Sequence, residues 1–222
     1  MNIAIIPARK NSKRIKNKNI KLFKGKPIIY WTIKYLKESK LFKEIFVSTD
    51  SKKIANLSEN YGVKALYPRP KLLSNDTTGI LKVMSYEVKK LIKRDNNFNN
   101  VCCVFPASPL LKKFYLIKGL SLLNKDTDFV FSVSKNEKST LRNFYLNDNY
   151  LQMINKKFLN FRTQDLPETF MDAGQFYWAE KKKWIKKKKI FSKRSKIVVL
   201  PKNLTVDIDT IQDWKRAVKL CK

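Results

Sequence analysis

The sequence predicts an α/β fold with a mainly parallel central sheet, and two observations support this prediction. Apolar runs rich in β-branched residues recur along the 222 residues, and several have segments of helical periodicity between them. The runs are almost continuously apolar, which is typical of strands buried on both faces of a parallel sheet. We therefore expect strands at 3–6, 45–48, 101–105, 129–133 and 197–200.

Two helices are predicted from periodicity together with their end signals. Apolar residues recur at helical spacing after Pro27, a favoured first-turn residue, so residues 27–39 are expected to be helical. Residues 51–61 form the second predicted helix, with Asp50 as its expected N-cap and Gly62 just past its end.

The chain is expected to form one domain over residues 1–222, with one irregular excursion. Hydrophobic residues make up 43% of the sequence, enough for a substantial core at this length. Neither internal repeats nor a Gly/Ser/Pro-rich linker divides it. Around 137–175 the pattern loosens into aromatic residues and polar turns, which predicts a lobe over the site or a dimerisation arm.

Composition argues against several kinds of site and location. No apolar stretch reaches the roughly 18 residues that a membrane span needs, and the apolar opening is too short for a signal peptide, so we expect a soluble, cytoplasmic protein. The chain has no histidine, which excludes an imidazole base. Its three cysteines lack metal-ligand spacing, and the adjacent Cys102 and Cys103 are interpreted as core packing.

The formal net charge of +30 allows two interpretations. A basic surface with 12% aromatic residues could bind single-stranded RNA or DNA, which is the hypothesis from a different functional class. The lysines, however, run from end to end, and no nucleic-acid motif is present, so we expect no specific nucleic-acid partner. The densest cluster, at 181–196, is either a solvated helix end or a phosphate-binding or partner-binding segment.

A loop dense in cations follows the first predicted strand. Ligands of parallel sheets bind at the carboxyl ends of strands, which is where this loop begins. The chain has only five glycines and neither a Walker A nor a Gly-x-Gly-x-x-Gly motif, so phosphate binding must rest on side-chain charge and backbone N–H groups. The residues that could form such a cradle are Ala8, Arg9, Ser12, Lys13, Arg14, Lys18 and Asn19.

Further short motifs follow this loop in order over nearly the whole chain. They are Val47-Ser48-Thr49-Asp50, Arg69-Pro70, Asp76-Thr77-Thr78-Gly79, Pro106-Ala107-Ser108-Pro109, Arg162-x-Gln164-Asp165-Leu166-Pro167 and Asp207-Ile208-Asp209-Thr210. Together with the loop they resemble the CMP-N-acetylneuraminic acid synthetase (acylneuraminate cytidylyltransferase) family. Within it, segment 172–178 resembles the pseudaminic acid branch.

This resemblance implies a Rossmann-like nucleotide-diphospho-sugar transferase fold, a homodimer, Mg²⁺ as cofactor and CTP as substrate. The implied reaction transfers CMP to the anomeric hydroxyl of an acidic nine-carbon sugar and releases pyrophosphate, providing precursors for surface glycans or flagellin glycosylation. Pseudaminic acid is the expected sugar, and sialic, legionaminic and octulosonic acids are the alternatives.

The resemblance also assigns roles to residues. The implied catalytic residues are Arg9, Lys13, Asp207 and Asp209. The residues implied to bind CTP are Ala8, Arg9, Ser12, Lys13, Lys18, Asn19 and Arg69. Those implied to bind the sugar are Arg162, Gln164 and Gln175; a guanidinium fork such as that of Arg162 matches a carboxylate bidentately.

Asp207 and Asp209 are the predicted ligands of Mg²⁺. On an extended segment two residues so spaced project to one face, as a hard divalent cation requires. The alternative is helix capping, because Thr210 and Asp213 have the spacing of a capping box that opens a final helix.

Overall fold

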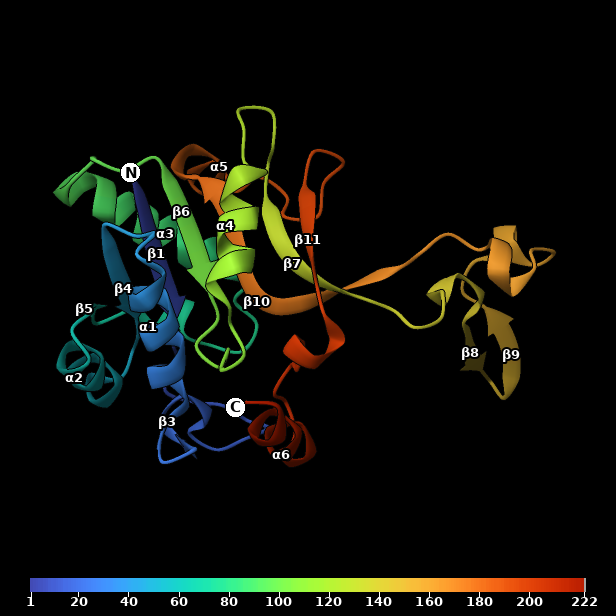
Figure 1. Ribbon diagram of the computed structural model, residues 1–222, viewed down its shortest axis with the longest axis horizontal. Helices are drawn as coiled ribbons and strands as arrows, with labels where there is room; N and C mark the ends of the chain where they lie inside the picture. Colours follow the sequence, from blue (N-terminus) through green and yellow to red (C-terminus); the bar gives the residue numbers. More distant parts are fainter. Residues whose placement is uncertain (222) are drawn as a thin grey trace.

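The computed structural model in Figure 1 describes residues 1–221 as a layered α/β body from which an arm projects. Seven strands form the central sheet in the order β11-β7-β10-β6-β1-β4-β5. All of them run parallel except β10, which is antiparallel to both β6 and β7. Their bounds are β1 Asn2–Pro7, β4 Glu44–Ser48, β5 Lys64–Leu66, β6 Asn100–Val104, β7 Val130–Lys135, β10 Phe170–Glu180 and β11 Lys196–Leu200.

Helices cover both faces of this sheet. Helices α1, α2 and α4 pack on one face, and α3 and α5 pack on the other. The helices are α1 Ile28–Ser39, α2 Lys52–Asn60, α3 Ile80–Arg94, α4 Lys113–Ser121, α5 Lys181–Ile185 and α6 Ile211–Leu220. Single 3₁₀ turns lie at Lys18–Ile20, Lys71–Leu73, Thr140–Arg142, Lys156–Phe158, Thr163–Asp165 and Lys202–Leu204. The predicted fold class, a mainly parallel sheet between helices, is confirmed.

The two predicted helices are present, with one correction at an end. Ser51 is the N-cap of α2, because its hydroxyl accepts a hydrogen bond from the Ile54 N–H at 3.4 Å. The Asp50 carboxylate instead accepts the Lys10 N–H at 2.7 Å, which ties the first loop to the end of β4. Gly62 lies past the helix at a φ of 74°, a left-handed angle that glycine adopts without strain.

The last helix closes the body beneath the first loop. The predicted capping box is present: Thr210 and Asp213 exchange hydrogen bonds at the start of α6. The ring of Trp214 packs edge-on against Phe23 at 5.5 Å between centroids, in a small separate core that also contains Ile15. Phe23 belongs to a short ribbon of β2 (Leu22–Phe23) and β3 (Lys26–Pro27). This packing holds the segment before α6 beside the loop that follows β1.

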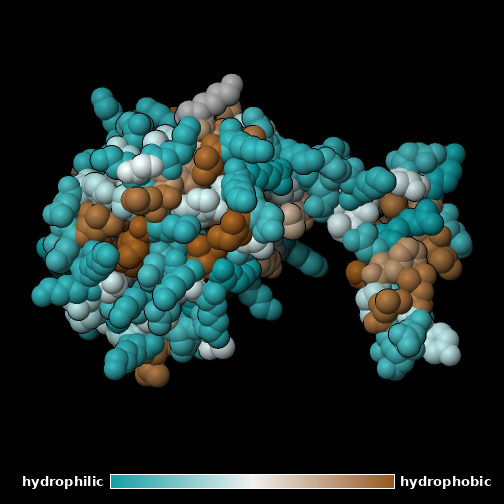
Figure 2. Space-filling model, turned by 90° about the horizontal axis from the view of Figure 1, so that it is seen from below, coloured by the Kyte–Doolittle hydropathy of each residue, from teal (hydrophilic) through white to brown (hydrophobic). Residues whose placement is uncertain are grey.

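The arm comprises the residues between β7 and β10 and includes the hairpin of β8 (Phe144–Asn147) and β9 (Tyr150–Met153). It stands clear of the body in Figures 1 and 2, and Figure 2 shows apolar side chains gathered on it. Residues 170–175, expected in this excursion, instead begin the long strand β10. The large apolar side chains of the arm that are exposed are Phe144, Tyr145, Leu146, Tyr150, Leu151, Ile154, Leu159 and Phe161.

Among residues 1–221, no helix has both the length and the apolar character needed to cross a bilayer.

Candidate active site

A cavity of about 660 Å³ opens at the carboxyl edge of the parallel strands. It is lined by the loop after β1, the segments after β5 and β6, the start of β10 and the segment before α6. Parallel strands bring these segments to one edge although they are far apart in sequence, which is the usual place for a ligand of such a sheet.

The cations of the first loop are held in position by hydrogen bonds and ion pairs. The buried Asn19 side chain donates to the Arg9 carbonyl at 2.9 Å and braces the loop. Arg9 and Lys13 both form ion pairs with Asp76, the Lys13 pair at 2.7 Å. The hydrogen bond from Lys13, assisted by the charge of Arg9, holds the pKa of Asp76 below its usual value. Arg9 and Lys13, both predicted to bind phosphate, therefore share the carboxylate of Asp76.

A second acidic group meets the same loop at its far end. Arg14 pairs with Asp209, and the Lys18 ammonium donates to the Ile208 carbonyl at 2.6 Å and lies 3.4 Å from Asp209. Asp207 forms no ion pair with any residue of the described chain, 1–221. Burial, with the nearby charge of Asp209, raises the pKa of Asp207.

The backbone at this acidic pair differs from the prediction. The Asp209 N–H donates to the Asp207 carbonyl at 3.2 Å, so the segment turns instead of running extended. Both residues nevertheless line the cavity, because the turn presents them toward the first loop.

Arg69 enters the cavity from the segment after β5. It is 5% exposed, and its Nε donates to the Ser74 hydroxyl at 3.1 Å. Behind it, Glu87 of α3 accepts a hydrogen bond from the Ser48 hydroxyl at 2.6 Å, and its second oxygen has no hydrogen-bond partner in the described part of the chain. Burial raises the pKa of Glu87, and burial lowers the pKa of Arg69.

The opposite wall is formed by the start of β10, where the strand bulges. The pairing with β7 shifts register between Asp172 and Tyr177. The Tyr177 hydroxyl donates to one oxygen of Asp172, and the Gly174 N–H donates to the other at 3.0 Å. Burial and the adjacent carboxylate raise the pKa of Tyr177 well above its usual value, so the phenol stays protonated as a donor.

Comparison with known proteins decides what this cavity belongs to. A family profile described as "Cytidylyltransferase" matches residues 3–222. This chain belongs to the cytidylyltransferase family. It is therefore a nucleotidyltransferase, as the motifs predicted.

Similar proteins are found along the whole length of this cytidylyltransferase. It is 38% identical over 223 residues to the pseudaminic acid cytidylyltransferase of Campylobacter jejuni, covering all of this chain and 96% of that one. It is 31% identical over 221 residues to the CMP-N,N'-diacetyllegionaminic acid synthase of Legionella pneumophila, covering 98% and 95% of the two chains. The solved structure of CMP:2-keto-3-deoxy-manno-octonic acid synthetase complexed with CTP shares its fold, with a TM-score of 0.71 at 14% identity, covering 99% and 97%.

Most residues assigned to the nucleotide and the metal lie together in the cytidylyltransferase cavity. Ala8 is the exception, since it is fully buried behind the loop and does not line the cavity. The assigned residues that line it are Arg9, Ser12, Lys13, Lys18, Asn19, Arg69, Asp207 and Asp209.

The three residues assigned to the sugar are not brought to the cavity of their own chain. Gln175 is 5% exposed and turns its amide to the Leu204 carbonyl inside the body. Arg162 and Gln164 lie on the arm, where Arg162 pairs with Asp165 at 2.6 Å. Their assignment to the sugar stays a prediction, because local motifs do not give the direction in which the arm leaves the body.

The sequence interpretation assigned no role to Asp76, Asp172 and Tyr177 and named Arg14 only as part of a possible phosphate cradle, although all four line the cavity. Each belongs to a quoted motif. Their ion pairs and hydrogen bonds across the cavity depend on the packing of distant segments, which no motif reveals.

Proposed function

We propose that this cytidylyltransferase transfers CMP from CTP to the anomeric hydroxyl of pseudaminic acid and releases pyrophosphate. The observation that carries the proposal is the cavity itself, where Arg9, Lys13 and Lys18 line the same space as Asp207 and Asp209, and that space is large enough for a nucleotide. The higher identity to the pseudaminic acid enzyme than to the legionaminic acid enzyme supports the choice of sugar.

The cations of the loop would bind the triphosphate. Arg9 and Lys13 exchange their pairing with Asp76 for phosphoryl oxygens, which carry more charge and accept shorter bonds. Arg69, buried on the other side of the same cavity mouth, adds a fixed guanidinium whose terminal nitrogens are not used in protein hydrogen bonds among residues 1–221. Alignment and charge neutralisation are the main catalytic work in such a displacement.

The acidic pair fits a Mg²⁺ ion. Two neighbouring carboxylates in a partly buried site repel each other, as the raised pKa of Asp207 reflects, and a divalent cation relieves that repulsion. Mg²⁺ in phosphoryl sites commonly takes one or two carboxylates and completes its shell with phosphate and water. When bound to Asp207 and Asp209, the ion would supply Lewis-acid polarisation of the phosphoryl oxygens. Isothermal titration with MgCl₂ in the absence of substrates tests this, since Asp207→Asn should abolish a binding event that the parent shows.

We further propose a homodimer joined through the arm. In a single chain the apolar side chains of the projecting hairpin are exposed to solvent. Such a cluster is more exposed apolar surface than one element of a monomeric protein usually has. A second copy that receives the arm would bury this surface and carry Arg162 to the other copy's cavity. Since CTP is a cytoplasmic metabolite, the proposal includes a cytoplasmic location.

Mixing two inactive variants tests the dimer and its shared site. Arg162→Ala and Asp209→Asn are expected to be inactive alone and, after co-expression with different tags and purification of the mixed dimer, to recover one intact site per dimer, about half of the parent dimer's activity. Recovery requires that Arg162 act in the partner's cavity. A mixed dimer as inactive as both parents, or a monomer in analytical ultracentrifugation, contradicts the proposal.

A further inference from the structure

The start of β10 gives the cavity an acceptor wall opposite its cations. Asp172 lines the cavity and makes no ion pair within residues 1–221, whereas Asp76 and Asp209 on the other side each pair with two cations. Asp172 and Asp207 are thus the acidic groups of the cavity that form no ion pair in the described chain, and of these two only Asp207 belongs to the proposed metal pair.

The carboxylate of Asp172 is held rigidly. One oxygen accepts the Gly174 N–H at 3.0 Å and the other accepts the Tyr177 hydroxyl. The Tyr177 ring is fixed in turn, since its centroid lies 5.4 Å from that of Phe105 and 6.0 Å from that of Phe131. An ionised carboxylate has about four acceptor positions, so two remain for a ligand.

The backbone bulge leaves room beside this carboxylate. Gly174 has a φ of +58°, and a Cβ placed on it would meet no atom within 4 Å. Asp172 and Gly174 both line the cavity, so the space beside the bulge belongs to the cavity.

We propose that Asp172 is a specificity-determining residue that accepts a hydrogen bond from a donor of the acidic sugar, either a hydroxyl or the N–H of an acylamino group. This inference rests on the proposed function. A nonulosonic acid carries one carboxylate and several donors, and Asp172 repels the former and accepts from the latter. The sugar therefore binds with its carboxylate toward the cations and its donor-rich side against β10.

The orientation gives Asp172 a role in choosing among sugars. Stereoisomeric acids present their donors at different positions, and a fixed acceptor discriminates against an isomer that leaves it unpaired. Tyr177 is a positioning residue, because its hydroxyl touches Asp172 and holds the carboxylate in one rotamer.

Steady-state pyrophosphate release by Asp172→Asn tests the inference. Asparagine keeps the shape and the acceptor for the Gly174 N–H but loses the charge and one acceptor. The KM for pseudaminic acid should rise about ten- to a hundredfold, as expected for losing a hydrogen bond to a charged group. The KM for CTP should stay within about twofold. The ratio of kcat/KM between pseudaminic and N,N'-diacetyllegionaminic acid should fall toward one.

Two further variants keep the test decisive. Tyr177→Phe removes a single hydroxyl and should raise the sugar KM severalfold without changing that of CTP. Asp126→Asn changes an exposed aspartate at the opposite edge of the sheet and should alter neither KM.

The outcomes separate this inference from the proposed function. An unchanged sugar KM in both Asp172→Asn and Tyr177→Phe, or a rise in the KM for CTP alone, overturns the inference while the parent's turnover stands. If Asp172→Asn lowers the melting temperature but leaves both KM values unchanged, Asp172 only stabilises the bulge, and the inference is overturned as well. No turnover of any nonulosonic acid by the parent enzyme overturns both.

Discussion

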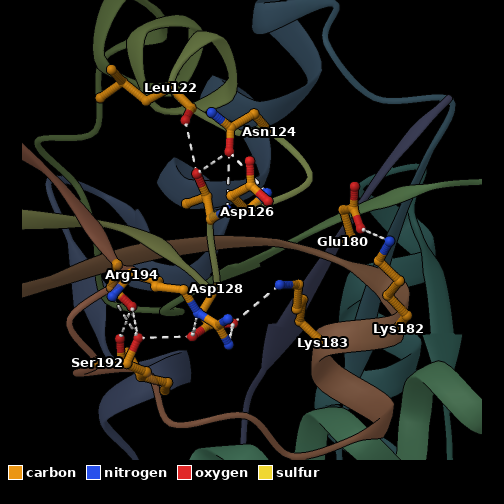
Figure 3. Close-up of polar contacts among 12 residues, drawn as sticks. Leu122, Asn124, Asp126, Asp128, Glu180, Lys182, Lys183, Ser192 and Arg194 are labelled. Carbon is orange, nitrogen blue, oxygen red and sulfur yellow. Dashed lines mark hydrogen bonds and ion pairs between the residues drawn. The ribbon is translucent and has the colours of Figure 1, made fainter.

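Two charged clusters lie at opposite edges of the same sheet, and they differ in how completely their charges are paired. At the amino edge, Asp128 just before β7 accepts hydrogen bonds from Lys183 at 3.1 Å, from Ser192 at 2.9 Å and from Arg194 at 3.3 and 3.4 Å (Figure 3). Its side chain is 4% exposed, and both oxygens are satisfied. At the carboxyl edge, Asp207 has no ion pair within the described chain, and one oxygen of Glu87 has no partner there.

The pKa values of the two clusters move in opposite directions. Burial tends to raise the pKa of Asp128, but the hydrogen bonds from Lys183, Ser192 and Arg194 outweigh it and lower the value to about 2. Burial and a like charge raise the pKa of Asp207. A buried charge that the protein pairs fully stabilises the fold, whereas unpaired groups in a cavity cost stability and are typical of a site that awaits a ligand. The comparison therefore predicts loss of activity from one edge and loss of stability from the other.

The largest expected effect is on turnover at the carboxyl edge. Asp209→Asn should lower kcat by at least about two orders of magnitude, the scale of losing a key electrostatic stabiliser. The melting temperature should change by no more than a few degrees, because Asp209 pairs with the exposed Arg14 and the partly buried Lys18 at the surface of the cavity. A variant with the parent's kcat would contradict the assignment of the acidic pair.

The second effect is on stability at the amino edge. Asp128→Asn should reduce the free energy of unfolding at pH 7 by on the order of 2 kcal/mol, because the lowered pKa of Asp128 measures its preferential ionisation in the fold. Urea unfolding measures the loss, and pyrophosphate release should stay at the parent's rate. Asp126→Asn, on the same turn but exposed, is the matched control and should leave both unchanged.

The pH dependence of that difference has a definite sign. The folded-state pKa of Asp128, about 2, lies below the ordinary value of an aspartate, so its contribution is present above about pH 4 and is lost as the pH falls toward 2. The gap between the parent and Asp128→Asn should therefore close across that window. A gap that stays constant to pH 2 would show that packing, and not charge, is lost.

The smallest effect concerns the pairing at the cavity mouth. Asp76→Asn frees Arg9 and Lys13 before CTP arrives, so the KM for CTP should fall about two- to fivefold, the scale of exposed ion pairs. Steady-state kinetics at constant ionic strength measures it. A rise in the KM instead would mean that Asp76 positions the two cations and does not compete with the phosphates.

Much of the fold was predictable because its signals are local. Five strands of the parallel sheet were predicted as apolar runs, and α1 and α2 were predicted from periodicity and their ends. The antiparallel strand β10 was not predicted, because its first half, with Asp172 and Gly174, has the composition of a polar turn. This half pairs with the sheet only through the bulge between Asp172 and Tyr177. Pairing with β7 across the whole arm, residues 136–169, is a tertiary effect that no local pattern carries.

The candidate site was predictable where it is contiguous. The loop of cations forms its own cradle, so Arg9, Lys13 and Lys18 could be assigned from order and spacing alone. The wall that carries Asp172 could not be predicted, because the direction in which its side chains point depends on the register of β10. The position of Arg162 on an arm away from its own chain's cavity could not be predicted either, since charge pattern gives the kind of ligand and not the direction of an arm.

The proposed function assigns the unpaired groups at the carboxyl edge to CTP and a sugar acid. The most direct test is pyrophosphate release on incubation with Mg²⁺, one nucleoside triphosphate and one acid from a panel of pseudaminic, N,N'-diacetyllegionaminic, N-acetylneuraminic and octulosonic acids. We expect release with CTP, the highest kcat/KM with pseudaminic acid and strong rejection of UTP and ATP, since polar groups that pair with cytosine are left unpaired by other bases. Equal rates with UTP, or no release with any acid of the panel, would contradict the proposed function.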